Sequence, residues 1–345
     1  MRTTTAYRAD APGADLRPTT IERRELRAGD IAVRITHCGV CHTDLHALRS
    51  TDSSAFPVVP GHEFVGVVSE IGSDVDTVAI GDPVAVGNIV DSCGECPMCR
   101  AGQQNYCDSF PTLTYGGADP ETGDRTMGAY SAEYVVRADF AYPLPAGLDP
   151  AGVAPLMCAG ATVWEPLRHW QTGPGKRVGI IGLGGLGHLA VKFAAALGAE
   201  VTVFTTSSAK EQDARSLGAE AVVVSTDAEA MRSARGSLDL IIDTVSADHD
   251  LGPYLRTLAL DGTLCHLGDL GPVGVDTMDL LIGRKSLSSS GSAGLPATRE
   301  MLDFCGEHGI TADVEVLPSA QVMTALDRLA KGDVRYRFVL DMSDL

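Results

Sequence analysis

Residues 177–187 read Arg-Val-Gly-Ile-Ile-Gly-Leu-Gly-Gly-Leu-Gly, a short apolar run followed by a cluster of glycines. The apolar run is typical of a buried strand, and apolar residues then recur with a helical period over 189–197. A Gly-x-Gly-x-x-Gly between a strand and a helix lets backbone N–H groups and the helix N-terminus hold a pyrophosphate. The stretch therefore predicts a dinucleotide site, formed by Gly182, Leu183, Gly184, Gly185, Leu186 and Gly187.

Strand and helix patterns alternate after this turn. Strands are predicted at 201–204, 221–224, 238–243 and 263–267, with helical stretches such as 210–217 between them. Regular alternation of this kind indicates an α/β fold with a parallel, doubly wound sheet. A glycine turn in an unrelated α/β fold is disfavoured by the repetition of these units.

The residues at the end of the second predicted strand indicate which dinucleotide is bound. An acidic residue there would bind the ribose 2′-OH and repel a 2′-phosphate. This chain instead has Thr205, Thr206, Ser207 and Lys210, whose hydroxyls and positive charge fit a 2′-phosphate. We therefore expect NADP(H), and the same hydroxyls also suit a helix cap.

Thiols, imidazoles and carboxylates are concentrated between Cys38 and Glu63, and these groups are typical zinc ligands. The alternating residues before them predict a strand over 17–36. A second cluster, in a loop of Gly, Pro, Asn and Asp, consists of Cys93, Cys96, Cys99 and Cys107. Four thiolates close a tetrahedron, so the 93–107 loop predicts a structural zinc rather than four unrelated buried thiols.

Cys158 lies where the composition changes toward Ala, Gly and Val. Together with Cys41 and His62 it gives a Cys₂His set, which leaves a fourth zinc position open. An open zinc polarises a carbonyl oxygen or lowers the pKa of a bound alcohol. Beside a nicotinamide, this chemistry predicts hydride transfer.

Composition excludes several other classes of protein. At 345 residues, two domains are expected. A formal net charge of -18 disfavours nucleic acid as a partner. The longest largely apolar run, 151–164, is too short to span a membrane, and the N-terminal residues lack a secretory pattern. Nine cysteines without that pattern suit metal binding, so we expect a soluble cytoplasmic protein with a small-molecule substrate.

These motifs together resemble the zinc-dependent medium-chain alcohol dehydrogenases. The resemblance rests on residues 39–46, 60–63, 158–162 and 182–187 and on the four-cysteine loop. Arg284-Lys285 and the run 334–339 resemble the branch of cinnamyl alcohol dehydrogenases and broad-specificity NADPH aldehyde reductases. The resemblance implies a GroES-like catalytic domain of residues 1–155 and 288–345, and a Rossmann domain of residues 156–287.

The resemblance also implies roles for individual residues. Cys41, His62 and Cys158 would bind the catalytic zinc, with Glu63 as an alternative ligand during exchange. Asp44 would orient a metal-bound imidazole. Thr43 would contact the substrate oxygen, and His46 would end a proton relay that passes through the nicotinamide ribose. Further cofactor contacts would come from Thr162, Leu186, Thr244, Gly268 and Ser290.

The expected activity is hydride transfer between NADP(H) and a primary alcohol or aldehyde, with aldehyde reduction in the cell. The enzyme would hold two zinc ions per chain and form a homodimer, as related dehydrogenases often do. An NAD-dependent alcohol or polyol dehydrogenase of the same superfamily is the enzymatic alternative. A zinc-binding protein without catalysis is disfavoured by the complete nucleotide motif.

Overall fold

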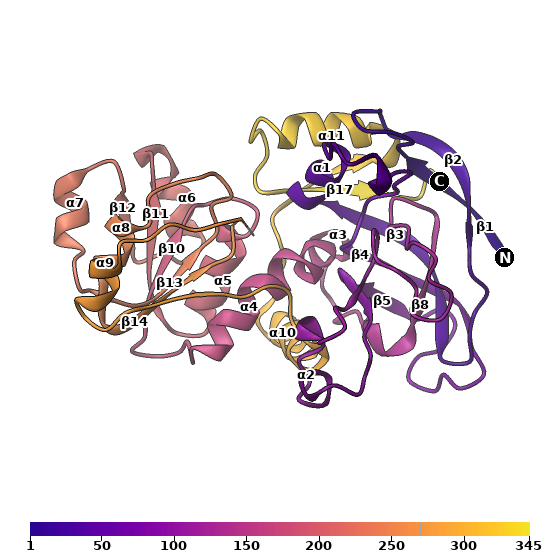
Figure 1. The fold of residues 1–345 in the computed structure, drawn as a ribbon, viewed down its shortest axis with the longest axis horizontal. Coiled ribbons are helices and arrows are strands. Elements are labelled where there is room, and N and C mark those ends of the chain that lie inside the picture. Colours follow the sequence, from indigo (N-terminus) through magenta and orange to yellow (C-terminus); the bar gives the residue numbers. More distant parts are fainter. Residues whose placement is uncertain (269–270) are drawn as a thin grey trace. The chain divides into compact units, whose positions relative to one another are not determined.

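The computed structural model describes residues 1–268 and 271–345, which form two compact units. The first consists of residues 1–158 and 293–345, and the second of residues 159–292. The chain thus leaves the first unit, completes the second, and returns (Figure 1). Within the described ranges, no helix has both the length and the apolar composition that a membrane crossing requires.

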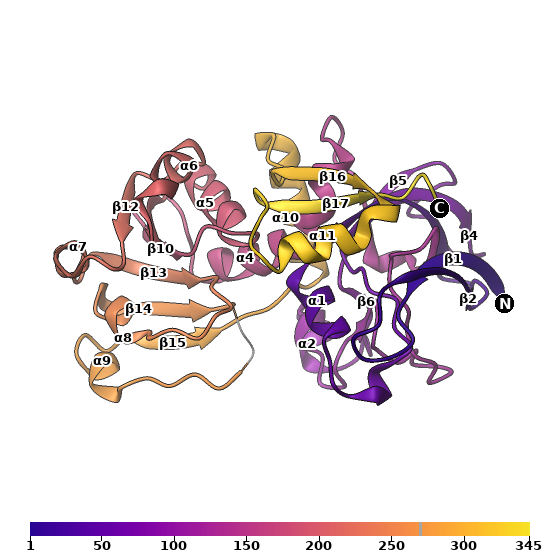
Figure 2. The same ribbon diagram turned by 90° about the horizontal axis from the view of Figure 1, so that it is seen from above.

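The second unit is built on a six-stranded sheet in which every pair of neighbouring strands is parallel. The strands are β10 (Arg177–Ile181), β11 (Glu200–Thr205), β12 (Ala221–Val224), β13 (Leu238–Asp243), β14 (Leu258–His266) and β15 (Ser286–Ser289). Their order is β12-β11-β10-β13-β14-β15, the strand order of dinucleotide-binding folds. Figure 2 shows β13, β14 and β15 side by side. The predicted doubly wound parallel sheet is confirmed.

Helices connect these parallel strands, as crossovers between parallel strands require. They are α5 (Gly187–Ala196), α6 (Glu211–Ser216), α7 (Ala228–Ser233), α8 (Gly252–Leu255) and α9 (Thr277–Leu281), and a further helix, α4 (Ala159–His169), precedes the first strand. The central strands β10 and β13 are apolar on both faces, and Val178, Ile180 and Ile241 are completely buried. This burial holds the carboxyl ends of the strands, which carry the predicted cofactor contacts, in fixed positions.

The first unit contains a seven-stranded sheet in the order β16-β17-β3-β4-β5-β9, with β8 paired to β3. Two smaller sheets consist of β1 with β2 and of β6 with β7. The strands of the whole unit are β1 (Arg2–Arg8), β2 (Arg17–Arg23), β3 (Asp30–Val40), β4 (Phe64–Ile71), β5 (Pro83–Val86), β6 (Ile89–Asp91), β7 (Thr112–Leu113), β8 (Glu133–Arg137), β9 (Ala141–Pro143), β16 (Val314–Pro318) and β17 (Arg337–Asp341). Its helices are α1 (His42–Leu48), α2 (Pro97–Arg100), α3 (Pro150–Val153), α10 (Leu295–His308) and α11 (Val322–Leu329). The first unit is therefore built mainly from β-strands.

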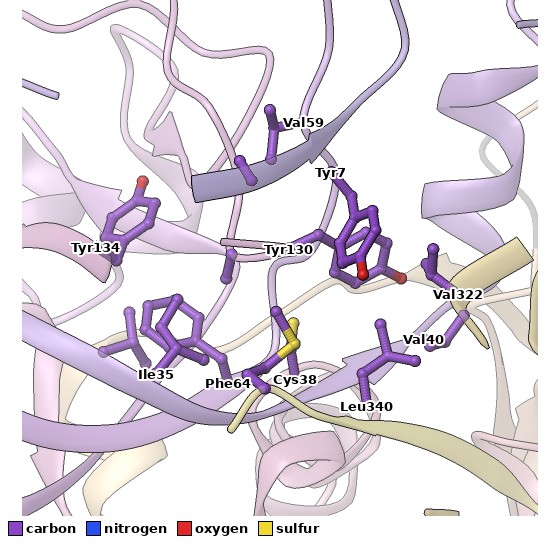
Figure 3. Packing of buried hydrophobic residues seen from close by; sticks show 14 of the residues in the cluster. Tyr7, Ile35, Cys38, Val40, Val59, Phe64, Tyr130, Tyr134, Val322 and Leu340 are labelled. Atoms are coloured by element: carbon purple, nitrogen blue, oxygen red, sulfur yellow. The ribbon is translucent and has the colours of Figure 1, made fainter. Parts of the chain in front are cut away.

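The core of this unit packs strands from both ends of the chain together. Figure 3 shows Cys38 among buried side chains that include Phe64, Tyr130 and Leu340. The Phe64 and Tyr134 rings lie 5.2 Å apart, centroid to centroid. Cys38 is completely buried in this cluster, which agrees with a packing role rather than a metal-binding one.

The single strand expected over 17–36 is wrong in detail, because the structure divides it into β2 and β3. The residues between them form a turn that is tied to the first residue of β3. Asp30 accepts a hydrogen bond from the Arg27 amide at 2.7 Å and pairs with the Arg24 guanidinium. These contacts fix the turn between the two strands, which alternation of apolar residues alone does not reveal.

Candidate active site

Three candidate metal ligands from separate segments of the first unit converge. Antiparallel pairing of β3 with β4 brings the end of one strand beside the start of the other, and so Cys41 beside His62. Cys158 follows a 3-10 turn over Ala154–Met157. The three ligand atoms lie within 4.8 Å of one another, with His62 Nε2 3.2 Å from Cys158 Sγ. The structure thus brings together the three residues that the sequence suggested.

The chemistry of these donors fits a zinc ion with an open position, because two sulfurs and one imidazole nitrogen are three of its four ligands. Contact with Cys158 lowers the pKa of the Cys41 thiol, and the positive charge of Arg337 acts in the same direction. Cys41 and His62 are buried, so a bound ion would be shielded from water on their side.

Asp44 supports this group from behind. Its buried carboxylate accepts hydrogen bonds at Oδ1 from His62 Nδ1 and the Gly61 amide, both at 3.0 Å. Its Oδ2 accepts from the Cys41 amide at 3.0 Å and from the Tyr130 hydroxyl at 3.1 Å. The bond to Nδ1 leaves Nε2 of His62 for the metal, as metal-binding histidines require.

Glu63 lies beside the same group and forms a buried ion pair with Arg337, a residue of β17. Burial raises the pKa of Glu63 to about 7, although the positive charge of Arg337 opposes this shift. Within the described residues, Glu63 Oε2 and Arg337 Nε have no hydrogen-bond partner. Sequence analysis noted Arg337 only as part of the run 334–339 and gave it no role at the site, although a charged residue at the start of an apolar strand was a usable signal.

Two tyrosines at the site were also missed. Tyr130 binds Asp44, and the ring of Tyr115 lies 5.8 Å from the His62 ring, centroid to centroid. Burial raises the pKa of Tyr115 well above its usual value, and the charges of Asp44 and Cys41 add to the shift. Neither tyrosine has a sequence signal, because each lies in a loop far along the chain from the metal ligands.

The residues expected to move protons lie on α1. Thr43 is in its first turn, with Oγ1 3.6 Å from Cys41 Sγ, and His46 is exposed in its last turn. Over residues 1–268 and 271–345, no recorded hydrogen bond links His46 to the other predicted site residues.

The second thiol cluster is closed, as a structural metal site requires. Its four sulfurs lie within 4.8 Å of one another, and the members are Cys93, Cys96, Cys99 and Cys107. The Cys96 amide donates to Cys93 Sγ, and the Cys99 amide donates to Cys96 Sγ, both at 3.4 Å. Hydrogen bonds from the amides of Asp108 and Cys99 lower the pKa of Cys96 to about 6. Four converging sulfurs are the donor set that a structural Zn²⁺ takes.

In the second unit, the glycine turn connects β10 to α5. Gly182 has a φ of 88°, a conformation that side chains other than glycine rarely adopt. A Cβ at Gly187 would lie 2.1 Å from the Gly182 carbonyl oxygen. The turn therefore needs both glycines, and it leaves Gly184 exposed just before the helix N-terminus, where a phosphate group fits.

Other predicted cofactor residues lie at the carboxyl ends of the parallel strands. Thr244, after β13, donates to the Ile181 carbonyl oxygen at 2.8 Å. Gly268, after β14, packs so closely on Val245 that a Cβ would overlap its backbone. Ser290 follows β15 and is buried. The sheet therefore brings these three residues to one edge, whereas Thr162 lies on α4, partly exposed.

The residues expected to hold a 2′-phosphate follow β11. Lys210 Nζ donates to the Leu183 carbonyl oxygen at 3.4 Å, which places the ammonium group beside the glycine turn. Ser207 caps the 3-10 turn Ser208–Lys210 by accepting from the Ala209 amide, and Thr206 is exposed. The helix-cap interpretation is correct for Ser207, and it leaves Lys210 and Thr206 available to a ligand.

Two stretches of the chain match known protein families. Residues 27–146 match the alcohol dehydrogenase GroES-like domain, and residues 185–307 match the zinc-binding dehydrogenases. The chain belongs to the zinc-dependent medium-chain alcohol dehydrogenases. The resemblance inferred from the motifs is confirmed, and with it the GroES-like fold and the assignment of an oxidoreductase.

Individual relatives cover nearly the whole chain. Aldehyde reductase YahK of Escherichia coli is 45% identical over 340 residues, 97% of this chain and 96% of the relative. A probable cinnamyl alcohol dehydrogenase 6 of Arabidopsis thaliana is 46% identical over 333 residues, 95% of this chain and 91% of the relative. The structure of the cinnamyl alcohol dehydrogenase SbCAD4 from Sorghum bicolor superimposes with a TM-score of 0.95 at 43% identity, covering 99% of this chain and 98% of that one. A cinnamyl alcohol dehydrogenase of Helicobacter pylori, complexed with NADP(H), gives a TM-score of 0.91 at 32% identity, with coverage of 99% and 98%.

Replacing Cys158 tests the division of the thiols between two metal sites. Cys158→Ser is expected to abolish activity and to reduce the zinc content from about two ions to about one per chain. Cys38→Ala, a change in the core thiol, is the matched control and should retain both ions. Metal analysis after dialysis measures the result, and full activity of Cys158→Ser would refute the ligand assignment.

The buried pair of Glu63 and Arg337 predicts a stability effect. Arg337→Leu leaves the Glu63 charge buried without its partner, so the free energy of unfolding should fall by about 3–5 kcal/mol. The double change Arg337→Leu with Glu63→Leu should lose less. Arg328→Leu, which breaks the partly exposed pairs with Glu315 and Asp333, should cost about 0–1 kcal/mol. Equal shifts in urea unfolding for the two arginine variants would contradict this account.

Proposed function

We propose that this enzyme reduces aldehydes to primary alcohols with NADPH. The observation that carries the proposal is the convergence of Cys41, His62 and Cys158 into a zinc-type donor set with one open position. The lysine beside the glycine turn, and the lack of an acidic residue at 205–210, support a 2′-phosphate. An NADP-dependent alcohol dehydrogenase C 1 of Mycolicibacterium smegmatis is 45% identical over 348 residues, which favours the same cofactor.

When both cofactors are bound, Zn²⁺ supplies a Lewis acid that polarises the carbonyl group, and NADPH supplies the hydride. The protein residues orient the reactants and move the proton. Asp44 fixes the His62 ring, and Thr43 donates a hydrogen bond to the substrate oxygen as the alcohol forms. His46, exposed to solvent, replaces the proton that Thr43 passes on. Glu63 serves as an alternative ligand during exchange.

The two units have different proposed roles. We propose that the first unit is the catalytic domain and that the second binds NADP(H). Within the second unit, the Gly182–Gly187 turn would hold the pyrophosphate, and Thr205, Thr206, Ser207 and Lys210 would surround the 2′-phosphate. Thr162, Thr244, Gly268 and Ser290 would contact the nicotinamide half of the cofactor.

We further propose that the chain forms a homodimer through the free edge of the parallel sheet. β15 is the last strand in that sheet, and apolar side chains near it are largely exposed. Leu260 is 71% exposed, Leu281 69% and Ile282 66%. Nine thiols with no disulfide among the described residues suit a cytoplasmic location, which we also propose.

One substrate panel tests the proposed activity. Aliphatic, aromatic and α,β-unsaturated aldehydes are assayed with NADPH and with NADH, and the corresponding alcohols and polyols with the oxidised cofactors. Faster aldehyde reduction with NADPH is expected. Preference for NAD(H) with alcohols or polyols would support the alternative dehydrogenase activity, and no turnover with zinc bound would overturn the proposal.

Thr205→Asp is expected to shift cofactor preference toward NADH. The carboxylate would repel the 2′-phosphate. It could still accept the hydrogen bond that the Ser207 amide donates to Thr205 Oγ1 at 3.4 Å. The ratio of kcat/KM for NADPH over NADH should fall by about tenfold or more. Thr226→Asp, after the neighbouring β12, adds the same charge and should leave the ratio unchanged. Unchanged ratios in both variants would contradict the 2′-phosphate assignment.

His46→Ala is expected to slow alcohol oxidation near neutral pH by a factor on the order of 10², and by much less in alkali, where hydroxide accepts the proton. His42→Ala removes another exposed imidazole of α1 and is the matched control. Steady-state rates between neutral and alkaline pH measure the effect. A defect of equal size at every pH would argue against a relay through His46.

A further inference from the structure

Asp243 is the last residue of β13, and its carboxylate is completely buried. The two ion pairs recorded for it are with imidazoles rather than with a lysine or an arginine. His266, the last residue of β14, lies beside it in the parallel register and donates from Nδ1 to Asp243 Oδ2 at 2.6 Å. His249 Nε2 lies 3.2 Å from the same oxygen. The carboxylate is therefore held in one position by groups on two neighbouring segments.

The other oxygen of Asp243 holds the backbone that follows the strand. Oδ1 accepts from the amide of Val245, the second residue after β13, at 3.1 Å. Between these two residues, Thr244 donates its amide and its hydroxyl to the Ile181 carbonyl oxygen, at 3.1 and 2.8 Å. The backbone at 244–245 is thereby attached both to β13 and to the end of β10, where the glycine turn begins.

Val245 lies between two of the glycines that are proposed to bind the cofactor. A Cβ at Gly182 would lie 2.8 Å from Val245 Cγ2. A Cβ at Gly268 would lie 1.9 Å from the Val245 carbonyl oxygen. Each glycine is therefore in close contact with Val245, so a shift of Val245 would disturb the edge of the sheet that carries the proposed cofactor contacts.

We propose that Asp243 is a positioning residue of the cofactor site, whose carboxylate holds Thr244 and Val245 in the conformation that the dinucleotide requires. This inference rests on the proposed binding of NADP(H) by the second unit. A segment that is already ordered loses less conformational entropy when a ligand binds, so the affinity is higher. Asp243 therefore acts on cofactor affinity through the Val245 amide, and His266 holds the carboxylate in place.

The test uses the full, zinc-loaded chain and measures two quantities, the dissociation constant for NADPH by nicotinamide fluorescence and kcat at saturating cofactor. Asp243→Leu removes the acceptor for the Val245 amide. The dissociation constant should rise about tenfold, the effect of one hydrogen bond. The value of kcat should stay close to native, because saturating cofactor orders the segment again. Asp243→Asn keeps an oxygen that accepts from Val245 and should restore most of the native affinity.

Asp239→Leu is the matched control. Asp239 lies on the same strand and accepts from the Arg177 guanidinium at 2.5 Å, away from the 244–245 backbone. Its loss should lower stability and leave the dissociation constant unchanged. Equal increases in Asp239→Leu and Asp243→Leu would overturn the proposal, because they would indicate a general loosening of β13. An unchanged dissociation constant in Asp243→Leu, or a loss confined to kcat, would also overturn it.

If Asp243→Leu fails to fold, His266→Leu gives a second test, because it removes the donor that holds Oδ2. A raised dissociation constant with native kcat supports the proposal, and an unchanged dissociation constant overturns it. If the native chain binds neither NADPH nor NADH, the proposed function fails and this inference fails with it. Native binding without an effect of either variant would overturn this inference alone.

Discussion

The buried carboxylate of Asp44 is the constraint on which the catalytic end of the first unit depends. A charge removed from water is tolerated only when hydrogen bonds replace its hydration. Its four donors come from three stretches of the chain, around residues 41, 61–62 and 130. All three stretches must be in place for the charge to be stable, so the network specifies where Cys41 and His62 lie.

Glu63 is the contrasting case. One of its oxygens pairs with Arg337, and the other has no hydrogen-bond partner among the described residues. Asp44 is saturated and therefore fixed, whereas Glu63 retains lone pairs that a metal ion can use. This difference supports the proposed division of roles, in which Asp44 orients a ligand and Glu63 exchanges with one.

The sequence predicts those features that local patterns determine. The glycine turn, each parallel strand and the four-cysteine loop lie within short stretches of the chain. In each stretch, the spacing of the residues follows directly from the local structure that they form. Joining Cys158 to Cys41 and His62 needed donor chemistry as well, because more than ninety residues separate it from either. Thr43 and His46 were identified by resemblance alone, since a threonine and an exposed histidine on a helix have no distinctive pattern.

What sequence reasoning missed was long-range pairing. Arg337 approaches Glu63 because β17 pairs with β3, and that pairing is a property of the whole sheet. Tyr115 and Tyr130 reach the site from a loop between short strands, where apolar alternation carries little information. The division of 17–36 into two strands was missed for a similar reason, because side-chain contacts to Asp30 set the turn.

The order of the two units along the chain also affects how the protein folds while it is synthesised. Arg337 and Glu63 are 274 positions apart, and the whole second unit is made between them. On the ribosome, the dinucleotide-binding unit is complete while β3 still lacks β17 on one side. The catalytic unit therefore spends most of its synthesis with an open strand edge, the kind of surface that pairs wrongly with other chains. The stretch most exposed to misassembly is thus the strand that leads into the metal ligands.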